Sequence, residues 1–367
     1  MMHSTPEALK SVKIVDSHVH LSQWYEHGQN FIDSLRAYRE ENSLEALGVV
    51  CIPYMGQKVK RDVSQNIMAA ILKWEDRNIY AFGGLVYPTQ PVSLPFPEDL
   101  RPERQAQVML DAGFDGIKML EGKPNARRFL GLPLCSPAYD AYYALLERHR
   151  VHIIWHVADP AQFWDPKQVS QQVIDAGWYY GGGGFLSREA LYAEILEVLR
   201  KFPLLKVTFA HFLFLEDDPE EAARVLDEYP NVCFDLTPHW RMYVSFTNKH
   251  DLWRDFFNKY ADRLILGTDN VSGYDPARMK KQIDFVRRFI GTGDIMALAG
   301  VQGLQGLNLD PDVAEKICSK NFLNRCGQSP RSMDKMVLYD YINSMLPYVA
   351  AGELRDQIVR YVKEKLM

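Results

Sequence analysis

The sequence predicts an α/β protein, a (β/α)8 TIM barrel with a C-terminal helical extension. Eight short runs rich in Val, Ile, Leu and Phe recur along the chain, and most are followed by a longer stretch with helical periodicity. Near-continuous apolar runs are typical of strands that are covered on both faces, as in parallel sheets. Eight such units over residues 12–291 favour a closed barrel over a doubly wound open sheet.

In chain order, the predicted strands occupy residues 12–21, 46–53, 79–86, 114–120, 151–158, 206–212, 232–237 and 264–270. Between them, apolar residues recur at three- and four-residue steps, which is typical of helices with one buried face. These helical segments are 64–76, 137–150, 188–202, 220–229 and 276–290. Asp310 and Pro311 supply an N-cap and a first-turn proline for a later helix that runs toward Arg325.

Three segments depart from a bare barrel. A Pro-rich loop, 88–97, follows the third strand, a long excursion, 159–184, follows the fifth, and a helical tail ends the chain. We therefore expect a barrel domain over residues 1–330 and a helical tail over 331–367. An apolar stripe on the tail suits either capping of the barrel or packing on a partner subunit of a homo-oligomer, and capping is the safer interpretation; the stripe comprises Leu354, Ile358, Tyr361 and Val362.

The composition is that of an ordinary globular protein. Of 367 residues, 42 are Lys or Arg and 47 are Asp or Glu, so the formal net charge is −5. This balance argues against a nucleic-acid or anionic-membrane partner, which needs a concentrated basic face. The chain lacks an apolar run of about 18 residues, as a membrane span requires, and its first residues lack a secretory signal. We expect a cytoplasmic protein whose partner is a small molecule.

The five cysteines are scattered and form no Cys-x-x-Cys pair. This spacing excludes a disulfide framework and the usual structural zinc knot. Any metal must therefore be held by histidines and carboxylates.

Polar side chains stand at the C-terminal ends of several predicted strands, where a barrel of this type carries its active site. They are His18 and His20 on the first strand, Lys118 on the fourth, His156 on the fifth, His211 on the sixth and Asp269 on the eighth. A lone histidine at a strand end is more often a hydrogen-bonded core residue than a ligand. So many such groups at one end of a barrel are difficult to obtain by chance.

Side chains alternate along a strand, so His18 and His20 face the same way, with Asp16 expected below them. By the same alternation, the side chains of Phe209 and His211 on the sixth strand are both expected to point into the barrel. On the fifth strand His152 would lie about 13 Å below His156, too deep to bind the same ion, and we interpret it as a core residue.

Imidazole and carboxylate ligands suit zinc, with manganese, iron or nickel as alternatives, and leave one position open for water. A divalent metal in such a site activates water and polarises a carbonyl oxygen. An aspartate beside the water can accept its proton and pass it to the leaving group.

The combination of His-x-His, two further strand-end histidines and a strand-eight aspartate resembles the amidohydrolase superfamily. The strings at residues 14–20, 113–118, 266–270 and 314–325 further resemble amidohydrolase family 2, which includes aminocarboxymuconate-semialdehyde decarboxylase and related metal-dependent hydrolases. The resemblance covers residues 12–326 and leaves the tail outside.

The resemblance implies roles for individual residues. In a one-metal site the ligands are His18, His20, His156 and Asp269, while His211 orients the water or stabilises charge on the substrate, and Lys118 contacts the substrate as a free ammonium. In a two-metal site His156 and His211 hold the second ion, and a carbamylated Lys118 bridges the two. One ion is favoured. For Lys118, a structural ion pair inside the barrel is the alternative.

Substrate selection is expected from the loops. Arg241 could clamp a carboxylate and His239 could hydrogen-bond to the ligand, although both could equally be surface loop residues. The excursion 159–184 contains aromatic residues beside four glycines, which indicates a lid with an aromatic inner wall, and Trp164 is a candidate substrate contact.

These features predict a metal-dependent hydrolase that cleaves a C–N or C–O bond of a small, carboxylate-bearing substrate. A non-oxidative decarboxylase of the aminocarboxymuconate-semialdehyde type is the alternative. A barrel that binds without catalysing is a third, less favoured reading, because the ligand set is intact.

Overall fold

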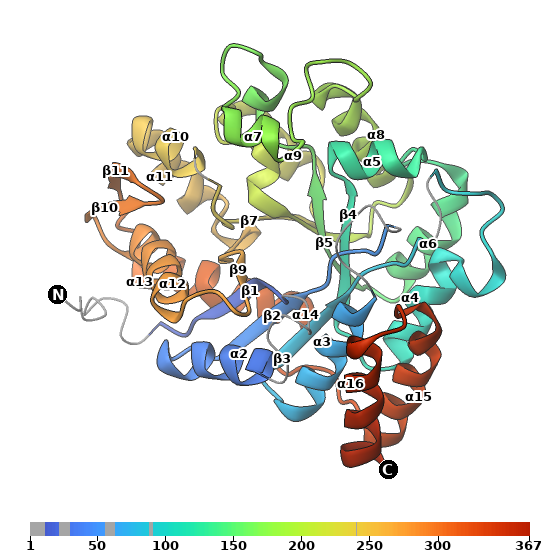
Figure 1. Ribbon diagram of the computed structural model, residues 1–367. Helices are drawn as coiled ribbons and strands as arrows, with labels where there is room; N and C mark the ends of the chain where they lie inside the picture. The colour runs from blue at the N-terminus through green and yellow to red at the C-terminus, as the bar shows by residue number, and fades with distance from the viewer. Residues whose placement is uncertain (1–11, 22–29, 56–62, 88–90, 240) are drawn as a thin grey trace.

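A computed structural model describes residues 12–21, 30–55, 63–87, 91–239 and 241–367 (Figure 1). All neighbouring strands of the main sheet are parallel, and their order is β8-β7-β6-β5-β4-β3-β2-β1-β9. The predicted barrel is confirmed. Its strands are β1(Val15–His20), β2(Ala46–Val50), β3(Ile79–Gly83), β4(Gly116–Gly122), β5(His152–Val157), β6(Lys206–Phe209), β7(Val232–Asp235), β8(Leu264–Ile265) and β9(Asn270–Val271).

The eighth predicted strand is divided into two pieces that together close the barrel. β8 pairs with β7, and β9 pairs with β1. Between them, the backbone N–H of Ser17 donates to the carbonyl of Leu266 at 3.2 Å. At the break, Gly267 is required because a Cβ there would lie 2.6 Å from Oγ1 of Thr237. The chain therefore passes close to its neighbours just before it reaches Asp269.

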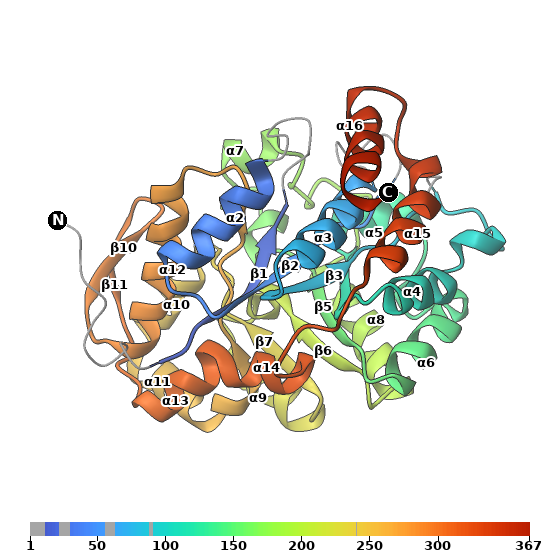
Figure 2. The same cartoon turned by 90° about the horizontal axis from the view of Figure 1, so that it is seen from below.

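Helices surround the sheet (Figures 1 and 2). Those along the barrel are α2(Asn30–Glu41), α3(Ser64–Glu75), α4(Pro102–Asp111), α5(Pro124–Leu130), α6(Asp140–Arg148), α7(Gln171–Asp175), α8(Arg188–Lys201), α9(Pro219–Glu228), α10(Met242–Asn248), α11(His250–Lys259) and α12(Pro276–Gly291). A hairpin of β10(Ile295–Leu298) and β11(Val301–Gln305) follows, and then α13(Pro311–Glu315) and α14(Asn321–Cys326). Within the described part of the chain, none of the helices has the length and apolar composition that a membrane crossing needs.

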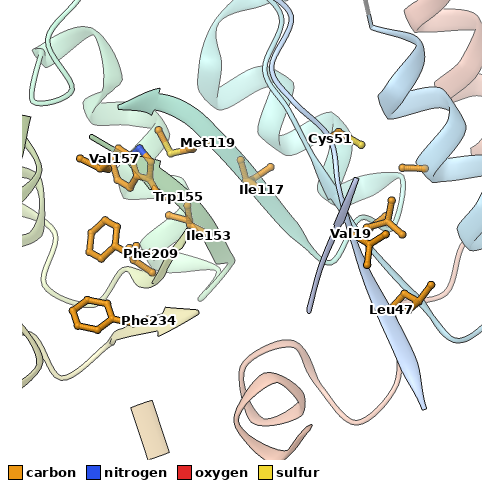
Figure 3. Packing of buried hydrophobic residues seen from close by; sticks show 14 of the residues in the cluster. Val19, Leu47, Cys51, Ile117, Met119, Ile153, Trp155, Val157, Phe209 and Phe234 are labelled. Carbon is orange, nitrogen blue, oxygen red and sulfur yellow. The ribbon is translucent and has the colours of Figure 1, made fainter. Parts of the chain in front are cut away.

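The main apolar core lies between the strands and the helices that cover them (Figure 3). A smaller cluster fills the barrel interior, where Phe322 and Leu323 of α14 pack against strand residues such as Val15, Phe82 and Ile154. His152 lies at this interior end, with Nε2 2.7 Å from Oγ1 of Thr208. It is a buried, hydrogen-bonded histidine, as expected.

Two expectations about side-chain direction are wrong. The pairing register of β1 shifts between Asp16 and Val19. Because this irregularity breaks the alternation, Asp16 does not lie below the histidines but accepts hydrogen bonds from Tyr38 on α2 and from Thr268. The second wrong expectation concerns the sixth strand, where Phe209 was expected inside the barrel. Strand pairing ends at Phe209, and its ring belongs to the outer core.

The C-terminal tail forms α15(Lys335–Met345) and α16(Glu353–Tyr361), and α15 packs against α3 (Figure 2). The rings of Tyr341 on α15 and Phe114 pack at a tilted angle, with their centroids 5.2 Å apart, and the hydroxyl of Tyr361 donates to Glu75 at 2.7 Å. In this structure the tail covers the outside of its own barrel.

Candidate metal centre and active-site cavity

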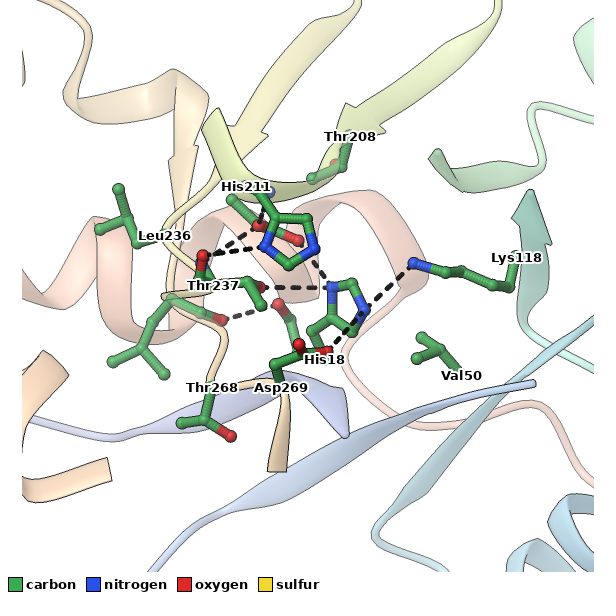
Figure 4. Close-up of polar contacts among 12 residues, drawn as sticks. His18, Val50, Lys118, Thr208, His211, Leu236, Thr237, Thr268 and Asp269 are labelled. Atoms are coloured by element: carbon green, nitrogen blue, oxygen red, sulfur yellow. Dashed lines mark hydrogen bonds and ion pairs between the residues drawn. The ribbon is translucent and has the colours of Figure 1, made fainter. Parts of the chain in front are cut away.

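Three of the predicted ligands, His18, His20 and Asp269, converge at the C-terminal end of the barrel. Figure 4 shows two of them, His18 and Asp269. The Nε2 atoms of His18 and His20 lie 3.3 Å apart, and Oδ1 of Asp269 lies 3.0 Å from Nε2 of His20 and 3.8 Å from Nε2 of His18. Two imidazole nitrogens and a carboxylate oxygen at this spacing form a donor set that suits a divalent transition metal.

The outer nitrogens of both histidines are committed to protein acceptors. Nδ1 of His18 donates to Oδ2 of Asp235 at 2.8 Å, and Nδ1 of His20 donates to the carbonyl of Val50 at 3.2 Å. Because these oxygens can only accept, the proton sits on Nδ1, and the lone pair on Nε2 points to the centre. This arrangement of acceptors behind the ligands is typical of metal-binding histidines.

His211 stands beside this group and presents the same nitrogen. Its Nδ1 donates to the carbonyl of Thr237 at 3.2 Å, and its ring centroid lies 6.0 Å from that of His18. The ring is not part of the three-residue group, but it lines the same cavity. Its Nε2 is therefore placed to accept a hydrogen bond from a molecule in the cavity.

His156 is oriented the other way round. Its Nε2 donates to the carbonyl of Ala158 at 3.0 Å and lies 3.1 Å from Oδ1 of Asp159. Nδ1 is thus the nitrogen of His156 that these acceptors leave unused. The ring centroid of His156 lies 5.0 Å from that of His211. Of the five predicted ligands, the structure gathers His18, His20 and Asp269 and leaves the other two in the adjoining wall.

Lys118 reaches the same centre from β4. Its Nζ lies 3.1 Å from Nε2 of His18, and the side chain is buried (Figure 4). A cation at this point faces the position that the donor set defines, so the predicted placement of Lys118 at the site agrees with the geometry.

Burial sets the charge of these groups. It lowers the pKa of His20 to about 4, although the neighbouring Asp269 carboxylate acts in the opposite direction. Burial, together with the charge of Lys123, also lowers the pKa of His156 to about 4, and burial lowers the pKa of His211 well below its usual value. All three imidazoles are therefore neutral near pH 7, the form that a ligand or hydrogen-bond acceptor requires.

Asp269 has the opposite balance. Burial alone would raise the pKa of its carboxyl, but the neighbouring imidazoles, that of His20 first and then those of His211 and His18, hold it well below its usual value. The carboxylate is ionised and available as a ligand or a proton acceptor.

A cavity of about 370 Å³ opens above the centre. His20, Lys118, His156, His211 and Asp269 contribute its polar part. The remaining wall is mostly apolar or aromatic and includes Ile52, Pro53, Met55, Leu120, Phe129, Trp178, Val271 and Tyr274, with Lys123 and Asn125 among them. The cavity therefore suits a small molecule with an anionic group and an apolar body.

The predicted substrate-binding residues lie outside the cavity lining. The indole N–H of Trp164 donates to the carbonyl of Leu186 at 3.0 Å, and Nε2 of His239 lies 3.3 Å from Oε2 of Glu216. Nη1 of Arg241 contacts Gln168 at 3.4 Å. Their neighbour Trp240 lies outside the described residues. From the excursion 159–184, Trp178 lines the cavity instead.

Two carboxylates that support the site were missed. Asp235 receives His18 on Oδ2, and its Oδ1 accepts the backbone N–H of His211 at 2.8 Å. Asp159 receives Nζ of Lys123 at 2.6 and 2.7 Å and the hydroxyl of Tyr180 at 2.6 Å. The available signal was position, since Asp235 lies near the C-terminal end of one predicted strand and Asp159 directly follows another.

Comparison with known proteins agrees with this geometry. The amidohydrolase family model, family 2 of its superfamily, matches residues 15–321, and the chain belongs to this family. The family indicates an enzyme that acts on small molecules. No curated protein gives a significant match.

Solved structures are similar at the level of the fold. A Staphylococcus aureus protein assigned as an amidohydrolase is 14% identical with a TM-score of 0.54, and the match covers 86% of this chain and 99% of that one. A 2,6-dihydroxybenzoate decarboxylase from Rhizobium is 13% identical with a TM-score of 0.50, over 86% and 99% of the two chains.

Proposed function

We propose that the protein is a metal-dependent hydrolase that cleaves a C–N or C–O bond in a small, carboxylate-bearing substrate. The observation that carries this proposal is the convergence of His18, His20 and Asp269, with the outer nitrogen of each histidine committed to a fixed acceptor. Zinc fits this donor set best, and manganese, iron and nickel are alternatives. One ion is favoured, with His156 or His211 available to complete its coordination.

The metal, when bound, supplies a Lewis acid that activates water and polarises the substrate carbonyl. Nε2 of His211 accepts a hydrogen bond from the attacking water and orients it. Asp269, which is ionised, takes the proton of that water and returns it to the leaving nitrogen or oxygen. Nζ of Lys118 donates to an anionic oxygen of the substrate.

A decarboxylase is the second candidate, and the aromatic wall of the cavity favours it. Phe129, Trp178 and Tyr274 can cover a planar ring whose carboxylate faces Lys118 and the metal position. The fold neighbour from Rhizobium is a decarboxylase of 2,6-dihydroxybenzoate. In this reaction the C–C bond to the carboxylate breaks, carbon dioxide leaves, and a proton from water, relayed through Asp269 or His211, replaces it on carbon.

The products distinguish the two reactions. We would test lactones, amides and aromatic or muconate-type carboxylates, with Zn²⁺ and Mn²⁺ added separately, in water enriched in oxygen-18. Label in the product without carbon dioxide supports the hydrolase. Release of carbon dioxide with no oxygen-18 in the organic product supports the decarboxylase and contradicts the hydrolase.

The metal site has its own test. The same test addresses the non-catalytic alternative, which predicts a protein without bound metal. We expect the purified protein to bind one divalent ion per chain and a variant with both His18→Ala and His20→Ala to lose it. His152→Gln is the matched control, since His152 is a buried histidine at the other end of β5. Equal metal content in all three proteins would show that the site assignment is wrong.

A further inference from the structure

The chain enters a strained turn immediately after β6. His211, Phe212, Leu213 and Phe214 have φ angles of 55°, 57°, 53° and 54°. This is the left-handed region, which L side chains other than Asn and Asp adopt rarely and usually as single residues. Four consecutive non-glycine residues in this conformation need support from the surrounding structure.

Much of this support comes from the first turns of α8. Nη2 of Arg188 donates to the carbonyl of Phe214 at 2.6 Å and to the hydroxyl of Tyr192 at 2.9 Å. That hydroxyl in turn donates to the carbonyl of Leu213 at 2.8 Å. Two successive carbonyls of the left-handed turn are therefore held by one pair of side chains.

The other end of the turn is fixed from the opposite side. Phe212 points into the outer core, where its ring lies 4.9 Å from that of Phe234 and 5.4 Å from that of Trp253. The backbone N–H of His211 donates to Asp235 at 2.8 Å. With Phe212 directed outward, the left-handed backbone turns the His211 ring toward Thr237 and the cavity (Figure 4).

We propose that Arg188 and Tyr192 are positioning residues for His211. They hold the carbonyls of Leu213 and Phe214, and this keeps the turn left-handed and the His211 ring in the cavity wall with Nδ1 on Thr237. Neither residue is among those that line the cavity, so both would act through the turn and not by contact with a bound molecule.

The test follows the His211 ring directly, by nitrogen-15 NMR of its imidazole in the purified protein before and after addition of Zn²⁺. We would compare Tyr192→Phe, which removes one hydroxyl, with Arg188→Met and Arg188→Lys. The matched control is Glu194→Gln, which weakens another ion pair of α8, to Arg127 at 2.8 Å, without contact to the turn.

In the wild type we expect well-separated signals of a single Nδ1-protonated ring. We expect Tyr192→Phe and Arg188→Met to draw the two signals together, because a ring that leaves the Thr237 carbonyl exchanges between its Nδ1–H and Nε2–H tautomers. We expect Arg188→Lys to restore part of the separation and Glu194→Gln to leave it unchanged. If Tyr192→Phe and Arg188→Met lower the melting temperature like the control but retain the wild-type signals, the two residues have only a structural role and the proposal is wrong.

This inference rests on the proposed role of His211 in the reaction, but the two can fail separately. If the His18→Ala/His20→Ala variant held as much metal as the wild type, the proposed function would be overturned, while the orientation of the His211 ring would remain as it is. Unchanged NMR signals would overturn the positioning role while metal binding persists.

Discussion

At the residue scale, Asp235 connects the two sides of the proposed site. One of its oxygens accepts from His18 and the other from the backbone of His211. We expect Asp235→Asn to lower the affinity for Zn²⁺ by about 10- to 100-fold, because the amide offers one acceptor where the carboxylate offers two. Competition with a metal-indicator dye measures this.

The control for that experiment is Asp115→Asn. Asp115 is also a buried carboxylate, but it pairs with Lys73 at 2.6 Å, away from the proposed ligands. If both variants bind Zn²⁺ with the affinity of the wild type, the hydrogen bond from His18 to Asp235 does not tune the metal site.

Glu121 has a different electrostatic signature. Burial raises the pKa of its carboxyl to about 7 from an ordinary 4.5, although the Tyr87 hydroxyl and the Leu120 N–H donate to it. The folded state therefore retains a proton that the unfolded state releases. The stability that this contributes is complete below pH 4.5 and is lost as the pH rises through about 7.

We expect Glu121→Gln to remove this dependence. Between pH 5 and pH 8, its free energy of unfolding should rise relative to that of the wild type by about 2–3 kcal/mol, measured by urea denaturation. Tyr87→Phe retains the titrating carboxyl and should keep the wild-type slope. Parallel pH profiles for Glu121→Gln and the wild type would contradict the prediction.

At the element scale, Asp159 fastens the excursion 159–184 to the barrel. It joins Lys123 after β4, His156 on β5 and Tyr180 within the excursion. Lys123 also lies over the ring of Trp178, 5.0 Å from its centroid. Through Lys123 and Tyr180, the buried Asp159 carboxylate therefore helps to position the part of the cavity wall to which Trp178 belongs.

We expect Asp159→Asn to destabilise the protein by about 3–5 kcal/mol, because it leaves the Lys123 ammonium without its buried counter-charge. Chemical denaturation measures the loss. Lys201→Gln is the contrasting variant, since its pair with Asp140 is exposed and should contribute less than about 1 kcal/mol. Similar losses in the two variants would show that the Asp159 pair is no stronger than a surface pair.

At the scale of the whole molecule, the tail is a covering for α3. Every residue from Ser64 to Lys73 of this helix is buried, and α15 packs directly against it. Removal of residues 331–367 would expose apolar surface of α3 to water. We expect the truncated chain to unfold at a lower denaturant concentration and to aggregate, as light scattering would detect.

Tyr361→Phe provides the mild counterpart, because it removes the hydrogen bond to Glu75 and leaves the ring in place, and it should cost about 1 kcal/mol. A truncated chain that is as stable as the full one would show that the tail is not needed for the barrel. A full-length dimer that becomes monomeric on truncation would assign the tail to a subunit interface.

The barrel and the convergence of His18, His20 and Asp269 could be predicted from the sequence because both depend on local patterns. Apolar runs define strands, and parallel strands of a barrel place their C-terminal ends together. The same patterns failed where the backbone departs from regular alternation. The irregularity in β1 turned Asp16 outward, and the left-handed turn after Phe209 directs His211 by a route that strand parity does not describe.

The sequence by itself therefore determined the fold, the family and the residue types that meet at one end of the barrel. Only the tertiary structure decided which nitrogen each histidine presents, which carboxylates stand behind them, and that Trp178 rather than Trp164 lines the cavity. The physical reason is the range of the interactions. Strand formation follows from neighbours along the chain, whereas the partner of a hydrogen bond, such as Asp235 for His18, is set by segments more than two hundred residues apart.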